Sequence, residues 1–126
     1  MGTFSVQARL PSGRETEIFV DTGSTFSKLP AVDLESLGVR PSFDIEVELG
    51  DGTIVRRSVG YVELEVQGRQ RLVPVAFGGV GERPLLGATA LEILGFAVDP
   101  SRKALVPARS LEIWGSVAAA GVATAP

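Results

Sequence analysis

Apolar and polar residues alternate along the first part of the chain in the pattern of two β-strands. The first strand has its apolar positions at Phe4, Val6, Ala8 and Leu10, a period of two that is typical of a half-buried strand. Pro, Ser and Gly at residues 11–13 predict a turn. The second strand, residues 15–20, ends in three apolar residues, so we expect it to enter the interior and to deliver the chain directly into Asp21.

Two further hairpins are predicted in the middle of the chain. In residues 44–57, apolar residues alternate with glutamates before the turn at Gly50-Asp51-Gly52. The second hairpin has Gly68 at its turn and alternating apolar residues on both sides, from Val62 to Phe77. We expect the second hairpin to follow the first directly.

Short helices are predicted at two places. One follows Pro30, has apolar positions at Val32, Leu34 and Leu37, and ends at Gly38. The other covers residues 88–94, with Gly95 after its last turn. A last pair of short strands follows at residues 96–98 and 104–106. About six to eight short strands with one or two helices indicate an all-β fold, a small closed barrel or a sandwich.

Composition removes several classes of function. The chain has a formal net charge of −3 and a pI near 4.9, which argues against a nucleic-acid partner. Its one basic cluster, residues 69–71, fits a solvated hairpin turn. There is no Cys and no His, so thiolate metal sites, cysteine nucleophiles and Ser-His-Asp triads are excluded. Carboxylates are then the natural groups for proton transfer in a hydrolase.

The organisation of the chain is simple. We expect one folded domain in residues 1–108, followed by a possible C-terminal interface segment in 109–114. Residues 115–126 carry no charge and no periodicity, so we expect a disordered tail there. Within Leu105 to Trp114, packing on the same domain and packing on a partner chain are equally open. No signal peptide and no apolar run of about 20 residues is visible, which predicts a soluble, cytoplasmic protein without membrane contact.

Asp21-Thr22-Gly23-Ser24 is the segment that carries candidate chemistry. A lone carboxylate at the inner end of a buried strand is costly to ionise unless it is paired or well hydrogen-bonded. Two carboxylates brought together share one proton, so that one acts as general base on water and the other as general acid. Hydroxyl groups of Thr22 and Ser24 and the N–H of Gly23 are suitable donors for such a pair. An ordinary Asx turn is the alternative, and the position after an apolar strand favours the catalytic interpretation.

These features together resemble the retropepsins and their single-domain prokaryotic relatives, a group of aspartic peptidases, over about residues 3–107. Three segments recur in the order of that family. They are a strand ending in Asp-Thr-Gly-Ser at residues 21–24, a glycine-containing hairpin at 50–52, and an apolar-apolar-Gly segment, Leu85-Leu86-Gly87, followed by the helix at 88–95. The combination is more specific than any one of them.

The resemblance implies a closed acid-protease barrel that acts as a symmetric homodimer on peptide substrates, without metal or other cofactor. Asp21 would supply one catalytic carboxylate, Thr22 would bond across the dimer axis, and Gly23 and Ser24 would support the carboxylates. The tip of a mobile flap would be formed by Gly50, Asp51, Gly52 and Thr53. The segment behind the catalytic loop would be Leu85, Leu86 and Gly87.

Two departures from the viral pattern concern the dimer and the flap. Many viral members have an arginine directly after the last glycine, bonded to an aspartate shortly after the catalytic loop. Ala88 stands at the first position, and residues 25–27 contain no acid, so other contacts must hold a dimer. The flap carries Asp51 and the pair Arg56-Arg57 and is more polar, so a viral substrate preference does not transfer.

The solitary Asp21 has a consequence for quaternary structure. No second Asp-Thr-Gly or Asp-Ser-Gly and no internal repeat is present, so one chain offers half of a dyad. A two-fold axis beside the loop would place Asp21 against its own copy. The sequence therefore predicts an obligate homodimer with one active site for each pair of chains.

Two other functions remain open at this point. The first is a catalytically inactive member of the same fold that serves as a dimerisation or peptide-binding module. The second is a carboxylate metal site formed by Asp21 with Glu15, Glu17 or Asp51. These acids lack the spacing of a ligand loop, and glutamates that alternate along strands normally form a solvated face.

Overall fold

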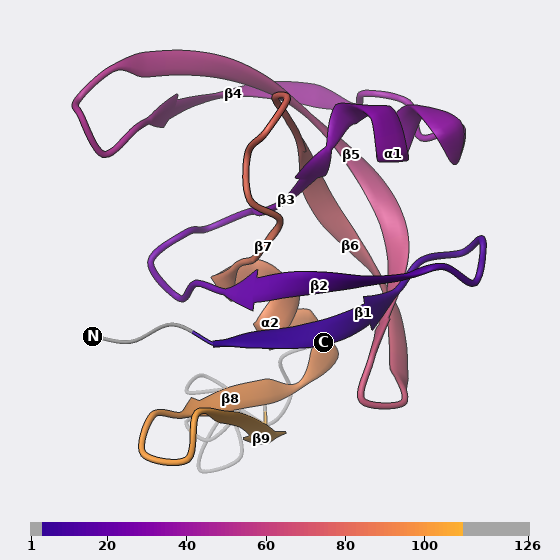
Figure 1. The fold of residues 1–126 in the computed structure, drawn as a ribbon, viewed down its shortest axis with the longest axis vertical. Coiled ribbons are helices and arrows are strands. Elements are labelled where there is room, and N and C mark those ends of the chain that lie inside the picture. Colours follow the sequence, from indigo (N-terminus) through magenta and orange to yellow (C-terminus); the bar gives the residue numbers. More distant parts are fainter. Residues whose placement is uncertain (1–3, 110–126) are drawn as a thin grey trace, which may run out of the picture.

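The structure is a computed structural model that describes residues 4–109. Its described part is mostly β, with two short helices (Figure 1). In chain order the elements are β1 (Ser5–Arg9), β2 (Glu15–Val20), β3 (Ser27–Pro30), α1 (Ala31–Ser36), β4 (Phe43–Glu48), β5 (Ile54–Val66), β6 (Arg69–Gly78), β7 (Leu85–Leu86), α2 (Ala88–Leu94), β8 (Phe96–Asp99) and β9 (Ala104–Pro107).

Seven strands form one curved sheet in the order β1-β2-β7-β3-β6-β5-β4, and β8 pairs with β9 separately. The sheet bends far enough for β1 to meet β5, but only Ala8 with Val66 and Arg9 with Glu65 are paired there. The predicted closed barrel is therefore not formed. The first half of β5 leaves the ring to pair with β4, so only the end of this long strand reaches β1.

The short strand β7 holds the middle of the sheet together. It runs parallel to β2, where Phe19 pairs with Leu85 and Val20 with Leu86, and antiparallel to β3 at Lys28. Parallel neighbours require long connections between them, and the chain between β2 and β7 contains β3 to β6. The β2–β3 loop, residues 21–26, thus begins beside a segment that is distant in the sequence.

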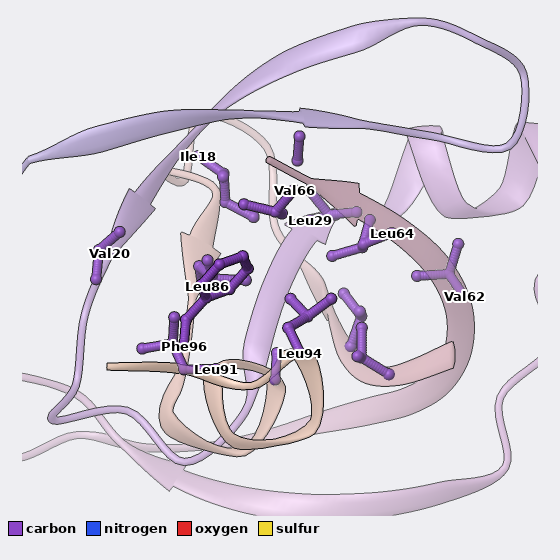
Figure 2. Packing of buried hydrophobic residues seen from close by; sticks show 14 of the residues in the cluster. Ile18, Val20, Leu29, Val62, Leu64, Val66, Leu86, Leu91, Leu94 and Phe96 are labelled. Atoms are coloured by element: carbon purple, nitrogen blue, oxygen red, sulfur yellow. The ribbon is translucent and has the colours of Figure 1, made fainter. Parts of the chain in front are cut away.

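The hydrophobic core lies between the curved sheet and α2 (Figure 2). Each of its members is less than one-tenth exposed, and together they come from every strand of the sheet except β4, from both helices and from β8 and β9. Labelled in Figure 2 are Ile18, Val20, Leu29, Val62, Leu64, Val66, Leu86, Leu91, Leu94 and Phe96. Since Val20 of β2 and Leu29 of β3 lie in this core, the strands that carry the β2–β3 loop are anchored where burial is most complete.

The hairpin turns occur where the glycines predict them. The turn at Gln67-Gly68 has positive φ at both residues, 49° and 82°, the geometry of a two-residue hairpin loop. The tip at Gly50–Gly52 joins β4 to β5 with Phe43 opposite Val59. Both predicted hairpins form, as β4–β5 and β5–β6, and they share β5, which is one continuous strand of 13 residues.

Both helices form close to their predicted positions. Gly38, with φ +76°, follows α1, and Gly95, with φ +80°, follows α2, as expected for left-handed residues after a helix. Val32 is 66% exposed and is not the buried position predicted. Arg69 is more than part of a solvated turn, because its Nη1 donates to the carbonyls of Leu94 and Gly95 at 3.0 and 2.7 Å and so satisfies the end of α2.

Several predictions concern parts of the chain that the structure does not describe. Residues 110–114 of the predicted interface segment and the predicted tail, residues 115–126, lie outside the described range. No helix within residues 4–109 is long and apolar enough to span a membrane.

Candidate active site

The loop that contains Asp21 begins directly at the end of β2. The backbone N–H of Asp21 donates to the carbonyl of Leu86 at 2.9 Å, which continues the β2–β7 pairing by one residue. This bond fixes the backbone of Asp21 at the point where the chain leaves the core. The side chain is half-buried, whereas Thr22 and Gly23 are exposed.

The Asp21 carboxylate is held by its own loop. Gly23 donates its N–H to Oδ1 at 3.0 Å, and Ser24 donates its hydroxyl to Oδ2 at 2.9 Å. Each oxygen accepts one of these bonds and keeps a lone pair for another donor. A Cβ at position 23 would lie 3.3 Å from Oδ1, which is why glycine suits this position. The carboxylate is therefore oriented before any ligand arrives.

The segment 85–89 lies behind the loop and is bonded to it on both sides of Gly87. Ala88 N–H donates to the carbonyl of Ser24 at 2.7 Å, and Thr89 N–H donates to that of Thr25 at 3.0 Å. Gly87 N–H donates to Oγ of Ser27 at 3.0 Å. Ser27 is a buried polar side chain, and this bond satisfies the buried amide that it faces.

Gly87 is required for this close approach and not for an unusual backbone angle. Its φ is −94°, which any residue can adopt. A Cβ there would lie 2.7 Å from the carbonyl atoms of Phe26 and from the carbonyl oxygen of Ser24. These are backbone atoms, so they cannot rotate away as a flexible side chain can.

A cleft of about 720 Å³ opens between the β2–β3 loop and the β4–β5 hairpin. Figure 1 shows this hairpin extending across the top of the molecule, above the loop. Gly23 and Ser24 line the cleft, but Asp21 is not among its lining residues. The remaining lining residues come from the end of the β2–β3 loop, the start of β3, the hairpin, β6 and β7: Thr25, Phe26, Ser27, Lys28, Ile45, Glu46, Val47, Glu48, Leu49, Gly50, Arg57, Ala76 and Leu85.

The predicted hairpin tip is only partly in contact with the cleft. Gly50 lines it, whereas Asp51, Gly52 and Thr53 do not. The tip is a closed turn in which Thr53 N–H donates to Oδ1 of Asp51 at 2.9 Å. Hydrogen bonds from the Thr53 backbone and hydroxyl hold the pKa of the exposed Asp51 below its usual value. Gly52 has φ +88°, the left-handed conformation that favours glycine.

The two faces of the β4–β5 hairpin differ in chemistry. Paired residues of antiparallel strands share a face, and Ile45 is opposite Arg57, while Val47 is opposite Val55. The half-buried residues Ile45, Val47 and Leu49 therefore form an apolar face with one cation. Glu46 is opposite Arg56 and lies on the exposed face. An apolar side chain of a ligand would find complementary surface on the first face only.

A cluster of three charges joins the hairpin to the wall of the cleft. Glu82, in the loop before β7, lies 2.9 Å from Nη2 of Arg57 and 3.4 Å from Nζ of Lys28. It also accepts the N–H of Gly79 at 2.9 Å. The hydrogen bond from Arg57 is the largest of several effects that lower the pKa of Glu82 to about 2. Arg57 and Lys28 are only 10% and 17% exposed.

Sequence analysis did not identify this cluster. Arg57 was noted only as part of a polar hairpin, although the alternation of apolar and acidic residues in β4 could have indicated that one of two adjacent arginines faces inward. Lys28 and Glu82 carry no such signal, because their partners are distant in the sequence. Phe26, which lines the cleft, was also missed.

No group of three or more Asp and Glu residues within residues 4–109 is close enough to hold a metal ion. The acids considered for a carboxylate site, Asp21 with Glu15, Glu17 or Asp51, do not form one. Oδ1 and Oδ2 of Asp21 are instead occupied by donors of its own loop.

Comparison with known proteins agrees with this geometry. The chain is similar in structure to the protease of Simian Foamy Virus (mac), with a TM-score of 0.55 and 21% sequence identity over 71% of this chain and 92% of the viral one. No curated protein matches the chain. At this identity the similarity to the viral protease concerns the fold.

The sequence also matches a protein family. The family profile described as "Aspartyl protease" matches residues 6–90, which include the Asp21 loop, the hairpin, the ion cluster and Gly87. The chain therefore belongs to the aspartyl protease family, and the resemblance to retropepsin-like aspartic peptidases is confirmed. Family and fold together support protease activity.

Replacing Gly87 with alanine tests whether the close approach of this segment to the loop supports the fold. We expect Gly87→Ala to lower the free energy of unfolding by about 1–3 kcal/mol, because the added methyl group forces the backbones of β7 and the loop apart. The measurement is urea denaturation followed by circular dichroism. Gly50→Ala is the matched control, since a Cβ at Gly50 meets nothing within 4 Å. Equal stability of the two variants would contradict the argument.

A second test concerns the pH dependence contributed by Glu82. Its pKa is about 2 in the folded protein, against an ordinary value of 4.5, so its stabilisation is complete above pH 4.5 and is lost as the pH falls toward 2. We expect Glu82→Gln to cost about 1 kcal/mol at pH 7, less than the pKa shift implies, because exposure screens the pair. Denaturation curves at several pH values should show this difference shrinking below pH 4.5.

Glu63→Gln provides the control for this pH series. Glu63 is exposed and accepts a hydrogen bond from Gln70, so its replacement removes one negative charge without touching the cluster. A loss of stability in Glu82→Gln that stayed constant down to pH 2, or one matched by Glu63→Gln, would mean that the ion cluster is not its cause.

Proposed function

We propose that the protein is an aspartic endopeptidase whose active site contains two Asp21 carboxylates, one from each chain of a symmetric homodimer. Membership of the aspartyl protease family supports the reaction class. The observation that carries the residue assignment is the Asp21 carboxylate, which is oriented by Gly23 N–H and the Ser24 hydroxyl at the edge of a large cleft.

The need for a second chain follows from the chemistry. A dyad requires two carboxylates that share a proton, and this chain has one Asp-Thr-Gly loop. Thr22 and Gly23 are exposed on that loop and are available for contact with a copy of themselves. In an isologous dimer, residues beside the two-fold axis meet their own copies, so one axis at Thr22 would bring both carboxylates together.

The reaction proceeds by proton transfers between these two groups and a water molecule. The ionised carboxylate removes a proton from water, whose oxygen attacks the carbonyl carbon of the peptide bond, while the protonated carboxyl group donates its proton to the carbonyl oxygen. The tetrahedral intermediate then breaks its C–N bond as the nitrogen takes up the proton that the first carboxylate removed from water, and a hydroxyl group of the intermediate returns a proton to the second carboxylate. One water is consumed, and a carboxylate and an amine are produced. Gly23 and Ser24 keep the carboxylates in position throughout.

The β4–β5 hairpin serves as a flap over the substrate in this proposal. Its apolar face would cover the peptide, and the glycines on both sides of Asp51 would allow the tip to move. A polypeptide in extended conformation fits a cleft of about 720 Å³, which has the size of known ligand sites. The Leu85-Leu86-Gly87 segment would hold the catalytic loop in place from behind.

Asp21→Asn should abolish peptide cleavage, by at least about a thousandfold in kcat, because asparagine can neither accept nor donate the proton. Cleavage of denatured casein or a peptide library is measured between about pH 3 and 7, with and without a statine-type inhibitor. The inhibitor should stop the wild-type protein, whereas a chelator should not.

Asp33→Asn is the control for this substitution. Asp33 lies in α1, accepts a hydrogen bond from Arg14 and does not line the cleft, so cleavage should continue at the wild-type rate. Residual cleavage by Asp21→Asn at the wild-type level would overturn the dyad. A wild-type protein that binds peptides but never cleaves them would instead favour the inactive binding module.

Mixing experiments test whether one site is shared between two chains. Inactive Asp21→Asn protein is added in threefold excess to a fixed amount of wild-type protein, and the chains are allowed to exchange. Random pairing leaves about one quarter of the wild-type chains with a wild-type partner, so activity should fall to about one quarter. Asp33→Asn in the same excess should add its own activity. Unchanged activity after addition of Asp21→Asn would mean that each chain has its own complete site.

A further inference from the structure

The cluster formed by Lys28, Arg57 and Glu82 contains two cations and a single carboxylate. Both cationic side chains contact Glu82, at 3.4 Å from Lys28 and 2.9 Å from Arg57. Salt bridges elsewhere among residues 4–109 involve more exposed arginines on the outer surface. This cluster is different because one positive charge remains uncompensated in a partly buried position, where electrostatic interactions are stronger than in water.

The two cations lie in the wall of the cleft, and the carboxylate does not. Lys28 and Arg57 are both lining residues, whereas Glu82 is not among them. Arginine has five N–H donors and lysine has three, far more than Glu82 can accept. No buried side-chain nitrogen within residues 4–109 lacks a hydrogen-bond partner, so the unused donors reach solvent, and the cleft is the space that these side chains line.

The backbone and its neighbours fix the position of Lys28. Its side-chain carbons pack against Gly78, where a Cβ would lie 2.9 Å from Cγ of Lys28. Lys28 is also paired with Ala76 and Leu85 in the sheet. A lysine with its aliphatic part held in this way presents its ammonium group with less loss of rotamer freedom on binding.

The other charged residues of the cleft lie on the opposite face of the hairpin from Arg57. Glu46 and Glu48 also line the cleft, but they alternate with Ile45 and Val47 and share the outer face of the hairpin with Arg56. The residues on the same face as Arg57 are apolar. A carboxylate that approaches Lys28 and Arg57 from the cleft would therefore meet two cations that share one acid, Glu82, which does not line the cleft, and no acid on that face of the hairpin.

We infer that this part of the cleft is a subsite for a carboxylate group of the peptide substrate, recognised by Lys28 and Arg57. The inference rests on the proposed function for the class of ligand. The carboxylate is supplied by a glutamate or aspartate side chain or by the C-terminus of the peptide. Glu82 is a positioning residue that holds the two cations beside each other and ties the base of the hairpin to the wall.

Binding and cleavage of matched peptides separate this inference from the proposed function. The peptides form a series in which one glutamate is moved through a neutral, apolar-rich sequence, with glutamine at the same place in each partner peptide. Each is made with a free and with an amidated C-terminus. Binding to Asp21→Asn protein is measured by fluorescence anisotropy, and cleavage by wild-type protein is measured as kcat/KM.

We expect about tenfold tighter binding of the glutamate peptide than of its glutamine partner at one position, because hydrogen bonds to charged groups are the stronger ones. If the C-terminus is the group recognised, amidation produces the loss and the position of glutamate has no effect. The preference should disappear as the pH falls through the ordinary glutamate pKa of about 4.3. The pKa of Glu82, about 2, leaves the charge of the cluster unchanged in that range.

Variants assign the preference to the cluster. Lys28→Met should abolish the discrimination between glutamate and glutamine peptides, and Lys28→Arg should retain it. Arg56→Met is the matched control, since Arg56 is adjacent to Arg57 but lies on the outer face, 3.3 Å from Asp44. Like Lys28→Met it removes one positive charge, here from the outer face of the hairpin, and it should leave the discrimination intact.

The outcomes distinguish the two ideas. Equal binding of all matched peptides by the Asp21→Asn protein overturns the carboxylate subsite, whether or not the wild-type protein cleaves them. A preference that Lys28→Met retains, or that Arg56→Met loses equally, also overturns it. A preference for the carboxylate without any cleavage by wild-type protein supports the subsite and contradicts the proposed peptidase activity.

Discussion

The contact between the backbone of Gly87 and the backbone of the β2–β3 loop is the constraint on which the rest of the site depends. It allows the amides of residues 87–89 to reach Ser24, Thr25 and Ser27, so that the loop is hydrogen-bonded along its length. Asp21 is bonded to the same segment through Leu86. A carboxylate at the end of a buried strand needs such support. Without these hydrogen bonds the loop would not hold the carboxylate in one orientation, and buried amides would lack partners.

The segment from Gly79 to Thr89 contacts both the β4–β5 hairpin and the Asp21 loop. Its first half carries Glu82, which contacts Arg57 of the hairpin and Lys28 of β3. Its second half forms β7 and supports the Asp21 loop. The hairpin and the loop are therefore attached to one short piece of chain, and the cleft lies between these two attachments. A peptide bound in the cleft would contact the apolar face of the hairpin on one side and the wall with Lys28 and Arg57 on the other.

Local patterns predicted most of the elements but not the course of the sheet. Gly68, Gly38 and Gly95 occur where a positive φ is required, and this requirement depends on the residue itself. The continuity of β5 was not predictable in this way, because Val59 and Gly60 are buried by other segments on both sides of a twisting strand. Val32 has the right period for a buried helical residue, yet α1 has only six residues and buries only Leu34. The prediction of a closed barrel was wrong because pairing at the sheet edges is set by long-range contacts, which a local pattern does not contain.

The sequence by itself determined the candidate catalytic groups and the turn positions: an Asp-Thr-Gly-Ser turn after an apolar strand, no histidine or cysteine, and glycines that mark the turns. Each of these follows from a residue and its immediate neighbours. Only the tertiary structure decided that Gly87 meets the loop, that Ile45 and Arg57 share the inner face of the hairpin, and that Glu82 lies between two cations. Arg57 and Glu82 are 25 residues apart, and their pairing depends on how the sheet folds over the core, which no local pattern contains.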